Sequence, residues 1–65
     1  MNNFEKPRVK LIGENGNSFY ILGKVRSALE RAGATEKYVD QYMEEAMSAD
    51  YNKLLTVTMK YVDVY

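Results

Sequence analysis

A glycine-rich loop offers the clearest binding chemistry in the sequence. Gly13, Asn15, Gly16, Asn17 and Ser18 follow a short apolar run and precede an amphipathic stretch, so the loop should join a strand to a helix. The first N–H groups of a helix have no partner within it, and the helix dipole is positive at that end. A strand, a glycine loop and a helix N-terminus together can therefore hold a small anion.

Basic side chains that could complete an anion site flank this loop. They are Arg8, Lys10, Lys24 and Arg26. The glycines do not match a P-loop, because no Gly-Lys-Ser or Gly-Lys-Thr follows them, and their G-x-x-G spacing is not that of a dinucleotide fingerprint. A purely structural interpretation is the alternative: Gly16 adopts a positive φ and the asparagines cap the turn.

The residue types that are missing argue against an enzyme. The 65-residue chain contains no cysteine and no histidine. Disulfides, zinc sites of the usual kind, thiol nucleophiles and Ser-His-Asp triads are therefore absent. Asp40 and Glu44 lie one helical turn apart and could bind a divalent ion, but a solvated helix face explains them equally well. We expect no catalysis, no metal and no cofactor.

Charge is balanced overall but divided along the chain. Nine basic and nine acidic residues give a net charge of zero. Residues 1–31 carry six basic and three acidic side chains, whereas residues 32–65 carry three basic and six acidic ones. Zero net charge argues against nucleic-acid binding, which usually needs an excess of positive charge. Complementary halves favour self-association, although one chain folding back on itself would also bring them together.

A short strand and a first helix surround the loop. The strand covers residues 9–12 and should bury Val9 and Leu11 on one face. The helix covers residues 18–32, with Asn17 or Ser18 as its cap and Gly33 as its stop. Glycine is unfavourable inside a helix, so we expect another helix, for example from a second copy, to approach Gly23 closely. The apolar stripe of this helix comprises Phe19, Leu22, Val25, Ala28, Leu29 and Ala32.

Two further helices and an extended tail follow. Thr35 should cap the second helix and Asp50 the third, which runs to about Tyr61. A strand from Leu54 onward also fits, because apolar and polar residues alternate there. Residues 62–65 should be extended and pair with the first strand. The apolar face of the second helix comprises Tyr38, Val39, Tyr42, Met43, Ala46 and Met47. That of the third comprises Tyr51, Leu54, Leu55, Thr58, Met59 and Val62.

These elements predict a mainly helical α+β fold. Residues 8–65 should form one small domain behind a flexible lead-in at residues 1–7. No apolar run is long enough to cross a bilayer and the first residues lack a signal-peptide core, so we expect a cytoplasmic protein. A core of this size is marginal, and self-association is the usual source of stability that remains without disulfides or metals.

The sequence resembles a family of short uncharacterised proteins from phages, prophages and bacteria. The resemblance covers residues 7–65 and is carried by VKLIGENGN, which is similar to the family's KLIGxDGN-type opening, by SADYNKLL and by the ending YVDVY. Glu14-Asn15 stands where an acidic residue followed by Asp is expected. The resemblance implies a compact protein associated with phages or mobile elements, and it implies no catalytic or binding residues.

We therefore predict a non-enzymatic binding protein that acts as a homo-oligomer. It would occupy a host protein surface, or hold a small anionic ligand in the loop between subunits. The alternative is a small nucleic-acid-binding module, with basic residues on the first strand and helix and tyrosines for stacking. The acidic second helix disfavours this alternative because it would repel phosphates. A purely structural role in a larger assembly is a third interpretation.

Overall fold

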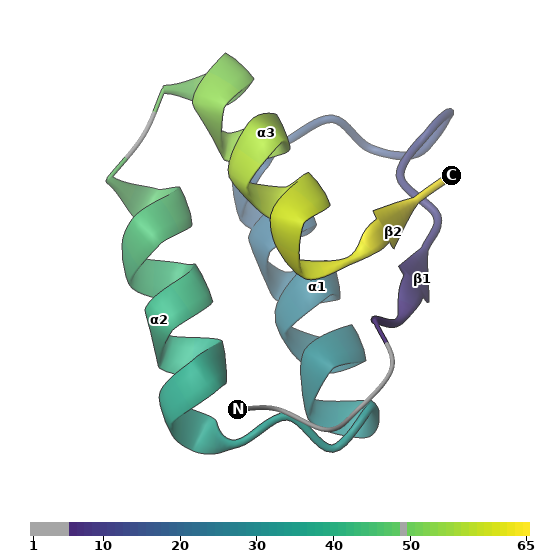
Figure 1. Ribbon diagram of the computed structural model, residues 1–65. Helices are drawn as coiled ribbons and strands as arrows, with labels where there is room; N and C mark the ends of the chain where they lie inside the picture. Colours follow the sequence, from purple (N-terminus) through teal and green to yellow (C-terminus); the bar gives the residue numbers. More distant parts are fainter. Residues whose placement is uncertain (1–5, 49) are drawn as a thin grey trace.

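The described residues form three helices and a pair of short strands. The computed structural model describes residues 6–48 and 50–65, so the predicted lead-in lies largely outside the described residues. In order, the elements are β1 (Arg8–Val9), α1 (Ser18–Arg31), α2 (Glu36–Met47), α3 (Tyr51–Tyr61) and β2 (Asp63–Val64) (Figure 1). The expected mainly helical α+β fold is confirmed. Among the helices described, none has the length and apolarity needed to cross a membrane.

Side-chain caps determine where the three helices begin. Asn17 Oδ1, Thr35 Oγ1 and Asp50 Oδ1 each accept a hydrogen bond from an N–H group two or three residues further on, at 2.8, 3.1 and 2.8 Å. Each cap satisfies a donor that the first helical turn leaves unpaired. Asn17, and not Ser18, is thus the cap of α1. The cap at Asp50 starts a helix that continues to Tyr61, so the competing strand interpretation from Leu54 onward is wrong.

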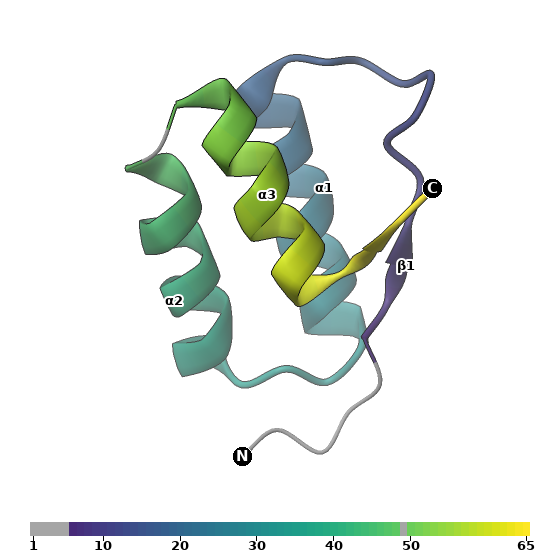
Figure 2. The ribbon, with the colours of Figure 1, turned by 45° about the horizontal axis from the view of Figure 1, so that its top comes forward.

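The two strands pair in parallel and bring the ends of the described chain together. Arg8 lies opposite Asp63 and Val9 opposite Val64, which confirms the predicted pairing of the tail. Both views show the strand pair on the side of α3 away from α2 (Figures 1 and 2). β1 is shorter than predicted because the N–H groups of residues 11 and 12 both bond to the carbonyl oxygen of Tyr65, at 2.8 and 2.9 Å.

The core fills the space between the helices and the strand pair. Val25, Leu29, Tyr42 and Thr58 have no solvent exposure. On β1, Val9 is buried as expected. The other buried apolar residues are Ile21, Leu22, Ala28, Val39, Ala46, Leu54, Val57, Tyr61 and Val62. The core therefore draws on β1 and all three helices, and the partly buried Val64 of β2 packs against it.

Four residues predicted on apolar stripes are instead exposed. Phe19, Met47, Tyr51 and Met59 have 77, 60, 47 and 54% of their surface open to solvent. Three short helices around one small core bury only part of a wide stripe, and residues at helix ends have few neighbours. On α3 the buried stripe is rotated from the predicted one, and it comprises Leu54, Val57, Thr58 and Tyr61.

The glycines divide into two groups by backbone conformation. Gly13 and Gly33 have positive φ values of 81° and 92°. The prediction that Gly16 adopts a positive φ is wrong, since Gly13 makes that turn. Gly16 lies against Tyr51 instead, because a Cβ added to Gly16 would be 3.3 Å from the tyrosine hydroxyl oxygen. Apart from its chain neighbours and the adjacent backbone of α1, no described atom comes within 4 Å of a Cβ added to Gly23. The predicted close approach of another helix is therefore not made within the described chain and would require a second molecule.

Candidate functional site

Three large apolar side chains stand exposed at one end of the helix bundle. Phe19 belongs to the start of α1, Met47 to the end of α2 and Tyr51 to the start of α3; their exposed fractions are 77, 60 and 47%. We call these three residues the bundle-end patch. If each side chain has about 200 Å² of surface, the patch exposes roughly 370 Å². The largest apolar patch on a typical monomer is of this order and is often functional.

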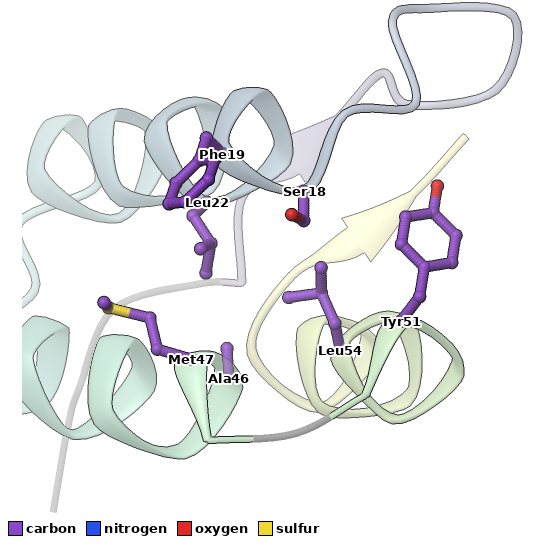
Figure 3. A pocket seen from close by; sticks show the side chains of 7 residues that line it. All are labelled: Ser18, Phe19, Leu22, Ala46, Met47, Tyr51 and Leu54. Atoms are coloured by element: carbon purple, nitrogen blue, oxygen red, sulfur yellow. The ribbon is translucent and has the colours of Figure 1, made fainter.

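The bundle-end patch surrounds an apolar hollow of about 260 Å³. Leu22, Ala46 and Leu54, one from each helix, line it between the three exposed side chains and are themselves buried. Figure 3 shows these side chains coming from three separate helices toward the same space. Ser18 completes the seven lining residues, none of which is charged. The hollow is therefore suited to an apolar group and lacks an ionic partner for a charged one.

Tyr51 connects the bundle-end patch to the glycine loop. A Cβ added to Gly16 would lie only 3.3 Å from the hydroxyl oxygen of Tyr51. The absence of a side chain at Gly16 therefore leaves room for the tyrosine. Tyr51 is the first residue of α3, directly after the Asp50 cap. The Asp50 cap thus determines the position of Tyr51, and Gly16 of the loop packs against the hydroxyl end of its side chain.

The backbone of the glycine loop is held by its own asparagines. Asn15 Oδ1 accepts a hydrogen bond from the N–H of Asn17 at 2.9 Å, and Asn17 Oδ1 accepts one from the N–H of Phe19 at 2.8 Å. These N–H groups are among those that an anion at the start of α1 would need. Among the predicted anion-site residues, Gly13 makes the turn, Gly16 faces Tyr51, and Ser18 lines the apolar hollow.

The basic side chain next to this loop, Lys24, is already paired with a carboxylate of the same chain. Lys24 Nζ lies 3.5 Å from Glu14 Oε1, and the Tyr20 hydroxyl donates to the same oxygen at 3.3 Å. Desolvation acts to lower the pKa of Lys24, but hydrogen bonds and electrostatic interactions with Tyr20 and Glu14 raise it overall. Lys24 therefore stays protonated and already has an anionic partner.

The other predicted basic residues make separate contacts. The Arg8 guanidinium carbon lies 4.7 Å from the centre of the Tyr65 ring, which is a cation–π arrangement. Arg26 Nε lies 3.5 Å from Glu30 Oε2, one turn along α1. Lys10 is exposed. Of the four basic residues, the structure thus places Lys24 in contact with the loop and gives Arg8 and Arg26 partners elsewhere.

The two acidic side chains that could have bound a divalent ion on α2 line two different hollows. Asp40 faces a hollow between α1 and α2, which Arg26 and Glu30 also line, whereas Glu44 faces a hollow with Gln41. Within the described part of the chain, no three acidic side chains gather where they could hold a metal ion. The arrangement fits solvated acidic helix surfaces.

A tyrosine cluster joins α2 to α3. The Tyr61 ring centre is 5.1 Å from those of both Tyr38 and Tyr42. Tyr61 donates a hydrogen bond to Glu45 Oε1 at 2.8 Å, and Lys60 Nζ reaches Glu45 Oε2 at 3.3 Å. Burial, then the hydrogen bond and charge of Glu45, raise the pKa of Tyr61 to about 12. The hydrogen bonds from Tyr61 and Lys60 in turn lower the pKa of Glu45.

No family model, curated protein or solved structure matches this chain. The likeness to short phage and prophage proteins stays a hypothesis. Within the described part of the chain, the bundle-end patch places three exposed apolar side chains around a hollow.

Sequence reasoning did not select the bundle-end patch as a binding surface. It placed Phe19, Met47 and Tyr51 on apolar stripes, and only Ser18 belongs to both the predicted anion site and the hollow. One signal was available for Phe19. At 3.6 residues per turn it lies about 120° around the helix from Val25, the centre of the buried face, so it falls outside that face. The other signal is position, since Met47 ends α2 and Tyr51 begins α3.

Proposed function

We propose that this chain is a small non-enzymatic binding protein that acts as a homo-oligomer. The observation that carries the proposal is the bundle-end patch, in which three exposed apolar side chains surround an apolar hollow of about 260 Å³. Exposed apolar surface costs free energy in water, and covering it is the main driving force of protein association. A surface of this kind therefore favours a role in contacting another polypeptide.

Size and charge support self-association as the way in which the patch is covered. A 65-residue chain buries a smaller fraction of its surface than a larger domain does, so an intermolecular contact adds needed stability. Its net charge of zero removes the long-range repulsion that keeps copies of a charged protein apart. Both properties act in the same direction as the exposed apolar surface.

Catalysis does not enter the proposal. The sequence contains no histidine or cysteine, which are the usual acid–base and nucleophilic groups near neutral pH. Tyr61 and Glu45 have shifted pKa values, but they hydrogen-bond each other across the α2–α3 contact. Such a pair is typical of a structural link between helices.

The proposal includes a partner from a host cell, which the likeness to phage proteins suggests. A host protein suits the bundle-end patch better than a small anion does, because none of the lining residues is charged, and it would compete with the second copy for this surface. An anionic ligand would have to displace Glu14 from Lys24 in the glycine loop. We favour a host protein or a small anion over nucleic acid as the partner. Lys24 and Arg26, which would have to contact phosphates, are each paired with a glutamate.

Sedimentation velocity and native mass spectrometry of the intact chain test this proposal. We expect an oligomer at micromolar concentration that dissociates on dilution and persists at high salt, because apolar contacts are not screened. A mass increase matching a nucleotide or another small anion would favour the anionic-ligand version. A chain that stays monomeric up to submillimolar concentration would contradict the proposal.

A further inference from the structure

We infer that two copies meet face to face across a two-fold axis, and that the Phe19 ring of each copy enters the bundle-end hollow of the other. This inference rests on the proposed function, because it specifies the contact within the homo-oligomer. It commits to a second copy of this chain as the occupant of the hollow. The shape, the charge and the area of the patch each support it.

The shape of the patch is self-complementary. Phe19 is 77% exposed and stands beside a hollow of about 260 Å³ lined by Leu22, Ala46 and Leu54 (Figure 3). In a two-fold contact the same patch of each copy faces the other. The projecting ring of one copy can therefore enter the hollow of its partner, and the partner's ring can enter the first copy's hollow. A cavity of about 150 Å³ accommodates a benzene ring, so the hollow has room for a phenyl group.

The absence of charge favours a second copy over a charged partner. Two-fold symmetry places identical residues opposite one another near the axis, which is unfavourable when they carry charge. All seven lining residues are uncharged, so two copies bring no like charges together there. A strongly acidic or basic partner segment would find no ionic partner in the hollow. The polar oxygens of Ser18 and Tyr51 can keep water at the rim.

The area of the patch predicts a weak, reversible dimer. Covering the patch on both copies would bury roughly 740 Å² of apolar surface, using the same side-chain areas as above. Homodimer interfaces are about 65% apolar, so the whole contact would bury roughly 1,100 Å². Specific interfaces start at about 1,200 Å², and smaller ones belong to transient complexes. The dimer should therefore exchange with monomer at micromolar concentration.

The first test removes the ring and keeps a matched control. In Phe19→Ala the Kd of the dimer should rise by at least about tenfold, as expected for a central aromatic anchor. The control is Ile12→Ala, which removes an apolar side chain that is 70% exposed but lies in the β1–α1 turn, outside the hollow. Its Kd should change by less than about twofold, because exposed residues outside an interface are energetically neutral. Circular dichroism establishes that both variants are folded.

The second test separates insertion of the ring from general stickiness. Phe19→Ala lacks the ring and keeps the six other residues that line the hollow, whereas Ala46→Leu keeps the ring and fills the hollow. Each variant alone offers no ring-in-hollow contact, but a mixture offers one. In an equimolar mixture, native mass spectrometry, which resolves the two masses, should show the mixed dimer well above the one-half share of all dimers that random pairing gives. If Ala46→Leu fails to fold, Ser18→Leu narrows the hollow from its rim and takes its place.

The outcomes distinguish this inference from the proposed function. If the wild-type chain is a dimer and Phe19→Ala dimerises equally well, the ring-in-hollow contact is wrong while the homo-oligomer stands. If Phe19→Ala weakens the dimer but the mixture shows no preference, the ring packs outside the hollow and the inference is overturned. If the wild-type chain is monomeric throughout, both proposals fail.

Discussion

Tyr42 on α2 and Thr58 on α3 share a hydrogen bond of 2.8 Å between their hydroxyl groups, and neither residue is exposed to solvent. Either oxygen can be the donor. Among the described residues neither hydroxyl has another hydrogen-bond partner, so each depends on the other for the hydrogen bond that water would otherwise supply. Burial raises the pKa of Tyr42, which keeps the phenol neutral in this position.

Removing one partner of this hydrogen bond should cost more than removing both. Tyr42→Phe leaves the Thr58 hydroxyl buried without that partner, and we expect a loss of about 1–3 kcal/mol in the free energy of unfolding. Thr58→Val likewise leaves the Tyr42 hydroxyl buried without its hydrogen-bond partner. The double variant should lose less than the sum of the two single losses. Urea unfolding of all four proteins measures the coupling, and strictly additive losses would contradict it.

The Tyr61–Glu45 hydrogen bond should make stability fall at alkaline pH. The folded chain keeps the proton on Tyr61 up to a pKa of about 12, whereas an unfolded tyrosine loses it near pH 10. Between these values the unfolded state binds fewer protons, so the free energy of unfolding decreases as the pH rises. The urea midpoint should therefore decline through this window in the wild-type chain and more weakly in Tyr61→Phe. Tyr65→Phe, which alters an exposed ring, is the control and should follow the wild type.

Protonation of Glu45 should weaken the fold at acidic pH. The pKa of Glu45 is lowered by hydrogen bonds from Tyr61 and Lys60, so the carboxylate is favoured in the folded state. This contribution is complete above the ordinary pKa of a glutamate and is lost as the pH falls through the lowered value. Glu45→Gln should reduce the acid dependence of the urea midpoint. Glu44→Gln, on the neighbouring residue, is the matched control, and an equal effect there would contradict the assignment.

Local sequence signals predicted the elements of this fold well. Thr35 and Asp50 have short polar side chains that accept from the first turn of a helix, so the starts of α2 and α3 were readable without tertiary information. The extended tail was also expected. The cap decided between helix and strand for α3, because periodicity alone fitted both.

Features that depend on packing between elements were not predictable from local signals. Val57 and Tyr61 are buried where Tyr51 and Met59 were expected, because the contacts of α3 with α2 and α1 select its buried face. The positive φ falls on Gly13 because the chain turns immediately after residues 11 and 12 bond to Tyr65. The bundle-end patch arises in the same way, since it is what the three helices leave uncovered where they meet.

Two glycines should respond in opposite directions to the same substitution. Gly13→Ala places a side chain at a φ of 81° and should cost about 1–2 kcal/mol. Gly23→Ala adds a methyl group that meets no described atom within 4 Å apart from its chain neighbours and the adjacent backbone of α1, and it should stabilise the helix by about 0.5–1 kcal/mol. Thermal unfolding at a concentration where the chain is monomeric measures both. A gain at Gly13 or a loss at Gly23 would contradict this prediction, and a raised dimer Kd in Gly23→Ala would show that a second copy approaches this glycine.

Glu14 should act as an internal competitor for any anion at the glycine loop. Its carboxylate lies 3.5 Å from Lys24 Nζ and accepts from Tyr20 at 3.3 Å, so an external anion gains little by displacing it. Glu14→Gln removes the charge and leaves Lys24 without its ionic partner. Inorganic phosphate should then shift the amide NMR signals of residues 15–24 in this variant more than in the wild-type chain. Glu30→Gln, which releases Arg26 from an ion pair outside the loop, is the control and should leave those signals unchanged. If phosphate shifts none of them in Glu14→Gln, the loop serves only to start α1 and to support Tyr51, and the anionic-ligand version of the function is wrong.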